Sequence, residues 1–225
     1  MAVEATPGPA RATTVLGIDP GLTRCGLGVV CGPDRRPRVV AATCVRTEPD
    51  QPLEQRLLVV QDAIEAVIAE HRPDAVAVER VLFSANVRSA MATGQAAGVA
   101  LVAAARAGLA VTPYSPNEVK QTVAGTGAAD KAAVGRLVAA QLGLDEVPRP
   151  ADVADALAVA LTHLARSRLA ARVVGTASAS VLADAHRAAD VAARGGWEAV
   201  LGDRLPPSSA RRTPTRSARP SPKGR

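Results

Sequence analysis

Four acidic side chains occupy positions where the surrounding sequence is apolar. Asp19 and Glu79 each end a short apolar segment, and Asp152 and Asp155 lie three residues apart at the start of a long apolar one. Burial of an unpaired carboxylate costs several kcal/mol, roughly, unless a cation or a donor meets it. Each acid also has an ordinary explanation: a turn residue before a Pro-Gly pair, a solvated strand end, or acids that favour a helix N-terminus.

Considered together, the four acids indicate a metal site. Ligand sites in open α/β sheets form beyond the carboxyl ends of strands, where Asp19 and Glu79 are predicted to lie. Asp152 and Asp155, at positions i and i+3, share one face of a helix. Four neighbouring carboxylates repel one another unless divalent cations lie among them, and Mg²⁺ or Mn²⁺ prefers oxygen ligands. Two such ions about 4 Å apart would support phosphodiester hydrolysis, so we predict metal-assisted phosphoryl transfer.

The elements that must position these acids are strands and helices in alternation. Apolar runs bounded by turn residues predict five strands, two of them in residues 15–30 and the others in 38–47, 75–79 and 109–114. Apolar residues at helical spacing predict helices over 52–72, 86–107, 117–125, 130–144 and 151–172, and Asp130 is the predicted N-cap of the fourth. This order is typical of a mixed five-stranded α/β sheet that helices cover on its faces.

Four stretches of the chain carry a resemblance to a known family. They are GIDPGLTRCGLGVV, VERVLFSANVRSAMATGQAAGVALVAAA, VKQTVAGTGAADKAAVGRLV and PADVADALAVALTH. In this order and spacing, over about residues 14–168, the chain resembles the RuvC family of Holliday-junction resolvases in the ribonuclease-H-like superfamily. The resemblance implies a homodimeric endodeoxyribonuclease that nicks two opposing strands of a four-way junction symmetrically. Its products would be 5′-phosphate and 3′-hydroxyl ends, formed in homologous recombination and DNA repair.

The resemblance also assigns residues. It implies that the four acids bind metal and act in catalysis, with two Mg²⁺ ions per site and Mn²⁺ as the alternative. Lys120 and Lys131 match basic positions that the family uses on DNA, and Arg80 and Arg88 flank the loop after Glu79. All four basic residues are predicted to bind DNA, although solvated lysines, or arginines paired with the site acids, would explain them too. Further implied partners are a second copy of the chain and the RuvA–RuvB branch-migration complex.

The chain departs from the family pattern at several positions. The family often places an aromatic residue three positions after the glutamate, where this chain has Leu82, and its only phenylalanine, Phe83, follows. We predict that Phe83 contacts the junction centre, with Leu82 as the alternative. The family's GQARG motif has Ala97 in place of its arginine, and KxQV has Ala133 in place of its glutamine. His163 lies too far along its helix to join the acids and is expected to be a core or surface residue.

Three other functions fit parts of the sequence. A related ribonuclease-H-like nuclease that acts on RNA or other branched nucleic acids remains the alternative. GIDPGLT also resembles the phosphate loop of sugar kinases and actin-like ATPases, but those proteins need two such halves and one is present. A non-enzymatic DNA-binding module would not need four acids.

Charge and composition divide the chain. The net charge is +6, but residues 204–225 hold seven basic residues and no acid, which leaves the other 203 residues at −1. Nucleic-acid binding must therefore depend on local patches, to which a tail of this kind adds phosphate attraction without sequence preference. The expected organisation is a disordered leader (1–13), a nuclease domain (14–170), a partly helical extension (171–203) and a basic disordered tail (204–225). Three cysteines without metal-ligand spacing indicate neither a disulfide framework nor a zinc site, and a cytoplasmic location is expected.

Overall fold

A computed structural model describes residues 12–32, 36–80 and 87–176, with side chains described as far as residue 169. Met1–Val173 forms one compact unit, which holds all the described elements except the last residues of the final helix. The strands are β1 (Thr13–Asp19), β2 (Arg24–Gly32), β3 (Arg38–Arg46), β4 (Ala75–Glu79) and β5 (Val111–Tyr114). The helices are α1 (Leu53–His71), α2 (Val87–Arg106), α3 (Pro116–Ala124), α4 (Lys131–Leu142) and α5 (Ala151–Thr176).

The five strands form one mixed sheet in the order β3-β2-β1-β4-β5. β1, β2 and β3 pair antiparallel, whereas β4 pairs parallel with β1 on one side and with β5 on the other. The predicted mixed five-stranded sheet is therefore confirmed. Its central strand is β1, whose carboxyl end lies next to that of β4 because Ile18 pairs with Val78.

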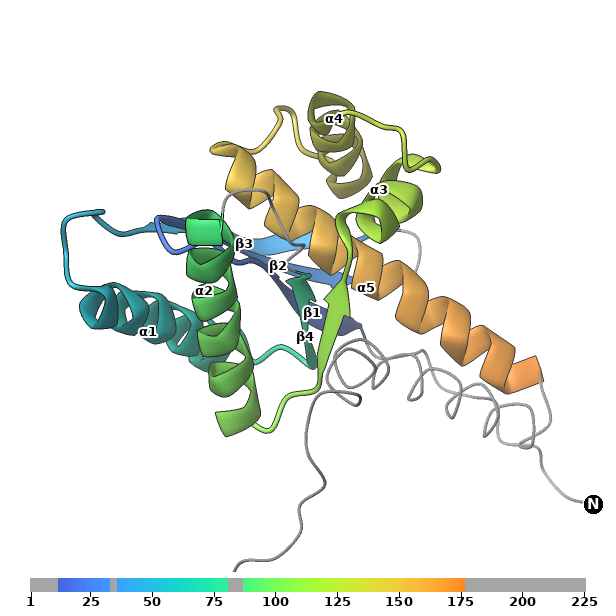
Figure 1. The fold of residues 1–225 in the computed structure, drawn as a ribbon. Coiled ribbons are helices and arrows are strands. Elements are labelled where there is room, and N and C mark those ends of the chain that lie inside the picture. Colours follow the sequence, from blue (N-terminus) through green and yellow to red (C-terminus); the bar gives the residue numbers. More distant parts are fainter. Residues whose placement is uncertain (1–11, 33–35, 81–86, 177–225) are drawn as a thin grey trace, which may run out of the picture. The chain divides into compact units, whose positions relative to one another are not determined.

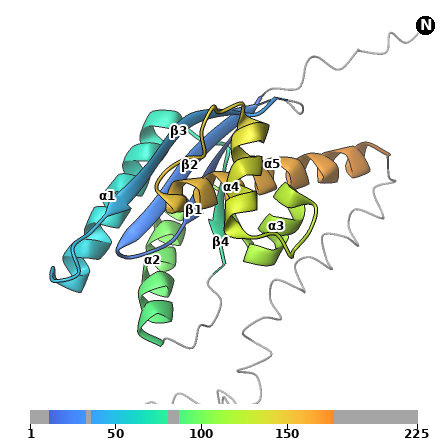
Figure 2. The same ribbon diagram turned by 90° about the horizontal axis from the view of Figure 1, so that it is seen from above.

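Helices cover both faces of the sheet (Figure 1 and Figure 2). On one face, β1, β2 and β4 contribute Leu16, Leu27 and Val76 to a core that α1 and α2 complete. On the other face, Val15, Val30 and Ala77 belong to a second core with α3, α4 and α5. Side chains alternate between faces along a strand, so each residue's position fixes which of the two cores it enters.

Helix α5 packs directly on the backbone of β1 and β2, where glycines make room for it. A Cβ atom at Gly17 would lie 2.1 Å from the carbonyl oxygen of Ala156, and one at Gly26 would lie 2.0 Å from that of Asp152. At Gly28 the nearest atom would be Leu157 Cδ2, at 2.9 Å. A side chain at position 17 or 26 would push the helix away from the sheet. Glycine at these two positions therefore allows the short distance between α5 and the sheet.

The ends of the helices follow the capping residues in the sequence. Asp130 accepts a hydrogen bond from the Ala133 backbone N–H at 2.6 Å, which confirms it as the N-cap of α4. Gly143, at φ 66°, ends the same helix in the left-handed conformation that glycine adopts without strain. The five strands and five helices predicted between residues 15 and 172 are present, with bounds that differ by a few residues, whereas the partly helical extension predicted for 171–203 falls largely outside the described residues. None of the described helices is long and apolar enough to cross a membrane.

Candidate active site

Asp19 and Glu79 are the last residues of two adjacent parallel strands. Gly17 lies beneath α5, and Ala77 belongs to the core on the same face of the sheet. Asp19 and Glu79 each follow two residues later in their strands, so their side chains point to the α5 face as well. Both side chains are partly buried at this edge. The structure thus brings together the two acids predicted to lie at strand ends.

The first turn of α5 brings the other two acids to the same edge. Gly26 of β2 is the pairing partner of Asp19, and the backbone of Asp152 lies directly over Gly26. Asp155 follows three residues later on the same helix face and is 22% exposed. Because the glycine admits the helix so closely, the start of α5 lies over the end of β1.

The pKa values record how the acids affect one another. The pKa of Asp19 is raised to about 7, first by burial and then by the charges of Glu79, Asp155 and Asp152, whereas Lys131 acts to lower it. The pKa of Glu79 is also raised, first by burial and then by Asp155. Because the charges of three other carboxylates raise the pKa of Asp19, the four acids form one electrostatic cluster. Such a cluster favours the binding of a divalent cation.

The side chains do not lie as ligands around one point. Within the described part of the chain, no group of three or more His, Cys, Asp or Glu side chains is arranged to hold a metal ion. Asp155 instead pairs with Lys131, whose Nζ lies 3.0 Å from Asp155 Oδ2. All four acids are partly buried, and their oxygens do not converge on one point in this arrangement.

A small pocket lies beside the acids. Its volume is about 60 Å³, and Glu79 and Asp155 line it together with Lys120 and Lys131. Lys120 reaches it from α3 and Lys131 from the first residue of α4. The two lysines predicted to bind DNA are therefore placed on the walls of one pocket with two of the predicted metal ligands.

Hydrogen bonds hold the turn that follows Asp19. The hydroxyl of Thr47, a buried residue after β3, donates to the Leu22 carbonyl oxygen at 2.6 Å. Arg56 of α1 donates to Thr47 Oγ1 at 2.9 Å and to Thr23 Oγ1 at 2.8 Å. These contacts tie the turn between β1 and β2 to β3 and α1, so that the turn next to Asp19 has one conformation.

The two arginines predicted to bind DNA are not among the described residues that line this pocket. Arg80 and Arg88 lie on either side of residues 81–86, and Arg88 lines an open groove with Leu22 and Arg56. Leu82 and Phe83 fall outside the described residues, so the prediction about the junction centre stays a prediction. The contacts of these basic residues with DNA are likewise untested expectations.

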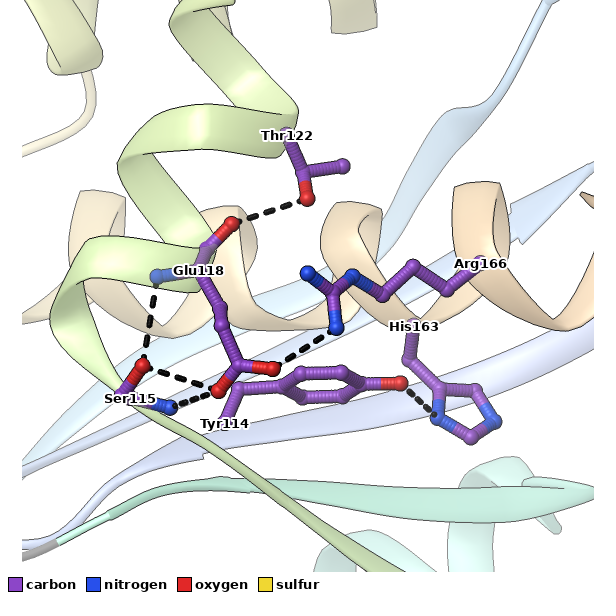
Figure 3. A network of polar contacts seen from close by, with 6 residues as sticks. All are labelled: Tyr114, Ser115, Glu118, Thr122, His163 and Arg166. Carbon is purple, nitrogen blue, oxygen red and sulfur yellow. Dashed lines mark hydrogen bonds and ion pairs between the residues drawn. The ribbon is translucent and has the colours of Figure 1, made fainter. Parts of the chain in front are cut away.

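A group of polar residues that the sequence patterns did not predict joins the end of β5 and the start of α3 to α5 (Figure 3). His163, expected to be a core or surface residue, is partly buried, and its Nδ1 lies 3.1 Å from the hydroxyl of Tyr114. Arg166 pairs with Glu118 at 2.7 Å and lies over the ring of Tyr114. Part of this group could have been predicted, because Ser115 and Glu118 have the Ser-x-x-Glu spacing of a helix capping box. The structure forms that capping box at the start of α3.

The sequence matches one family over most of the described domain. A family model described as crossover junction endodeoxyribonuclease RuvC matches residues 15–163. The protein of that name from Salinispora arenicola is 56% identical over 162 residues, which cover 70% of this chain and 93% of that protein. The one from Leifsonia xyli is 48% identical over 200 residues, or 88% of this chain and 96% of that protein. The latter alignment therefore extends well beyond the 149 residues of the family match.

Solved structures agree with this match. RuvC of Thermus thermophilus is 42% identical with a TM-score of 0.66, and the similarity covers 70% of this chain and 96% of that one. The structure of T. thermophilus RuvC in complex with a Holliday junction substrate gives 42% identity and a TM-score of 0.67, with the same coverage. The yeast mitochondrial Holliday junction resolvase, 14% identical with a TM-score of 0.50, shares the fold alone. The expected ribonuclease-H-like α/β fold is confirmed, and the chain belongs to the RuvC family of crossover junction endodeoxyribonucleases.

Proposed function

We propose that this protein is a structure-selective endodeoxyribonuclease that resolves four-way DNA junctions in recombination and repair. It would nick two opposing strands symmetrically and leave 5′-phosphate and 3′-hydroxyl ends. The observation that carries the proposal is the cluster of four acids from β1, β4 and α5, in which Asp19 feels the charges of the other three. A family member solved with a Holliday junction substrate supports the choice of DNA.

The acids suit Mg²⁺, with Mn²⁺ as the alternative, at two ions per site. Asp19, Glu79, Asp152 and Asp155 supply hard oxygen donors, and their mutual repulsion favours binding of a cation. Bound ions would activate the attacking water and stabilise the leaving oxygen of the phosphodiester. Only Oδ2 of Asp155 is paired with Lys131, so its other oxygen is available to a metal ion.

The lysines of the pocket are then placed to bind the DNA backbone. Lys131 of α4 and Lys120 of α3 both line the pocket beside Glu79 and Asp155. Their ammonium groups are therefore close to the acids. Phosphate contacts of this kind orient DNA without reading its sequence, which suits an enzyme that selects a shape. Arg80, Arg88 and Phe83, which follow β4 in the chain, would extend the contact towards the junction centre.

An exposed apolar face on α2 supports a homodimer. Val87, Met91 and Leu101 are 68%, 61% and 49% exposed. They are four and ten residues apart along α2, which places all three on one side of the helix. Gly94 and Gly98 fill the positions between them, and a Cβ atom at either would meet nothing within 4 Å. The resulting spacing of four, three, four and three residues is that of a helix–helix seam. Two copies joined here would present two active sites to a two-fold junction.

The other expectations remain proposals. A cytoplasmic location and a partnership with the RuvA–RuvB complex follow from the proposed role. Residues 171–203 and the basic tail from 204 are proposed to lie outside the nuclease domain. Deletion of residues 204–225 should weaken junction binding at low salt and leave it unchanged at high salt, because the tail contributes only charge.

A panel of substrates tests the function. The full chain would be incubated with Mg²⁺ and a mobile four-way junction, a fork, a duplex and an RNA–DNA hybrid built from related strands. We expect paired nicks at symmetrical positions in the junction alone, and DNA ligase should seal them. Equal cutting of the duplex would contradict junction selectivity, and preferential cutting of the hybrid would favour the alternative, a nuclease that acts on RNA.

A further inference from the structure

A network of polar contacts joins the first turn of α3 to the middle of α5 (Figure 3). One carboxylate oxygen of Glu118 accepts hydrogen bonds from the Ser115 backbone N–H at 2.9 Å and from its hydroxyl at 2.8 Å. The other oxygen lies 2.7 Å from Nη1 of Arg166. Because both oxygens are engaged on opposite sides, the carboxylate is held in one orientation and links the two helices.

The buried ring of Tyr114 forms the floor of this network. Its hydroxyl lies 3.1 Å from His163 Nδ1, and the guanidinium carbon of Arg166 lies 5.6 Å from the ring centroid. Burial lowers the pKa of His163 and raises that of Tyr114, which favours the uncharged forms of both groups in this hydrogen bond. His163 and Arg166 are three residues apart, and one face of α5 therefore contacts the end of β5 and the start of α3.

This network adjoins the candidate active site without entering it. Tyr114 pairs with Glu79 across β4 and β5, and α3 begins two residues after Tyr114. Lys120, two residues after Glu118, lines the pocket with Glu79. A helix of nine residues is only marginally stable alone and needs contacts elsewhere to fix its direction. The side chains of Arg166 and Glu118 are 42% and 33% exposed, and such a pair adds little stability, so orientation is its main effect.

We propose that Arg166 and Glu118 are positioning residues for junction binding. Their ion pair fixes the first turn of α3 against α5 and thereby keeps Lys120 directed at the pocket that holds Glu79 and Asp155. The proposal rests on the proposed function, since it takes Lys120 to bind the junction backbone. Neither Arg166 nor Glu118 lines the pocket, so both act through Lys120.

A double-mutant cycle tests the proposal. Junction affinity would be measured in Ca²⁺ for the full chain, Arg166→Met, Lys120→Ala and the variant with both changes. We expect each single change to weaken binding about three- to tenfold, as for one phosphate contact, and the double change to weaken it no more than Lys120→Ala alone. The slope of log affinity against log salt concentration should also become shallower in all three variants, by the amount expected for the loss of about one phosphate contact.

Two further variants separate orientation from stability. Glu118→Gln keeps the capping box, because glutamine serves at that position too, but it removes the charge that Arg166 meets, so it should weaken binding as Arg166→Met does. Arg106→Met breaks a comparable exposed pair with Glu65, of 3.3 Å, between α1 and α2 and should bind as the unchanged chain. In Mg²⁺ at saturating junction, Arg166→Met should cut at the unchanged rate, because its effect is on affinity.

The outcomes decide between the explanations. Unchanged affinity of Arg166→Met and Glu118→Gln overturns the proposal, and so does a double variant whose weakening is the product of the two single effects. If Arg166→Met does not fold, as judged by circular dichroism, Glu118→Gln takes its place in the cycle with Lys120→Ala. An unchanged chain that binds no junction contradicts the proposed function instead, and the two failures are thus distinguished.

Discussion

Asp19 is held where burial and three like charges oppose its ionisation. The same features that raise its pKa to about 7 make it a strong point of attraction for a divalent cation. An aspartate in this position lowers the stability of the metal-free fold, which is a cost that a purely structural residue would not impose. This balance has consequences for both cleavage and stability.

Replacement of Asp19 by asparagine should abolish cleavage and spare binding. Asparagine keeps the size of the side chain and lacks the charge that a metal ion needs, so we expect cleavage of a four-way junction in Mg²⁺ to fall at least about 10³-fold. Binding to the junction in Ca²⁺ or EDTA should remain within about threefold, because the phosphate contacts are elsewhere. The control is Asp62→Asn, an exposed acid on α1, which should cut normally. An Asp19→Asn protein that still cuts would remove the basis of the metal site.

The same residue should give the metal-free protein a distinctive pH dependence. The folded state holds the Asp19 proton up to about pH 7, whereas in the unfolded state the group ionises near 3.8, so stability is lost as the pH rises between these values. Asp19→Asn removes this loss, and at pH 8 in EDTA it should be more stable than the unchanged chain by up to about 4 kcal/mol, with a smaller difference at pH 5. Urea unfolding of both proteins at several pH values measures this difference in stability. A difference that does not change with pH would contradict a raised pKa for Asp19.

At the scale of the element, the position of α5 decides whether the acids meet. The helix carries Asp152 and Asp155, and its distance from the sheet is set by glycines in β1 and β2. A helix displaced by one side-chain diameter would move two of the four acids away from the other two. The strands alone, with Asp19 and Glu79 at their ends, would then form half a site.

Substitution of these glycines should have graded effects. Gly17→Ala would place Cβ 2.1 Å from the Ala156 backbone, so α5 must shift, and we expect a loss of about 3 kcal/mol in the free energy of unfolding together with much slower cleavage. Gly28→Ala is the matched control. A Cβ atom there would lie 2.9 Å from Leu157 Cδ2 and 3.0 Å from the Leu157 backbone nitrogen, a milder overlap than at Gly17, so the loss should be smaller. Urea unfolding and junction cleavage test both, and equal losses would argue against the steric explanation.

Much of this arrangement could be predicted from the sequence, for identifiable reasons. Periodicity of apolar residues marked every helix and strand, and acids next to apolar runs marked Asp19, Glu79, Asp152 and Asp155. The network of Tyr114, His163 and Arg166 could not be found in this way, because ion pairs and ring contacts between distant segments leave no period in the sequence. The closeness of α5 was also missed, although alternate glycines in β2 indicated it. The direction in which a carboxylate points is set by its neighbours, such as Lys131 beside Asp155, and the sequence does not reveal those neighbours.

At the scale of the whole molecule, the exposed face of α2 is the feature that one copy of the chain leaves unexplained. Val87, Met91 and Leu101 present large apolar side chains on a helix whose opposite side is packed on the sheet. A charge on this face should separate the proposed dimer. We expect Met91→Glu to weaken self-association at least about 100-fold, because it would bury an unpaired carboxylate.

Sedimentation velocity measures this change, and Leu169→Glu is the control, because Leu169 is 64% exposed on α5, away from α2. The monomer should also lose coordination of the two cuts, so that a junction on a supercoiled plasmid gives single nicks in place of paired ones. Met91→Glu protein that remains dimeric would place the interface on another surface.

The order of the acids along the chain bears on when this enzyme can become active during its synthesis. Asp19 emerges first, Glu79 follows after two more strands, a helix and most of β4, and Asp152 and Asp155 come only at the start of the last described helix. A nascent chain can therefore build most of its sheet while it still lacks half of its acids. Truncated products and chains still in translation would therefore lack part of the proposed metal site.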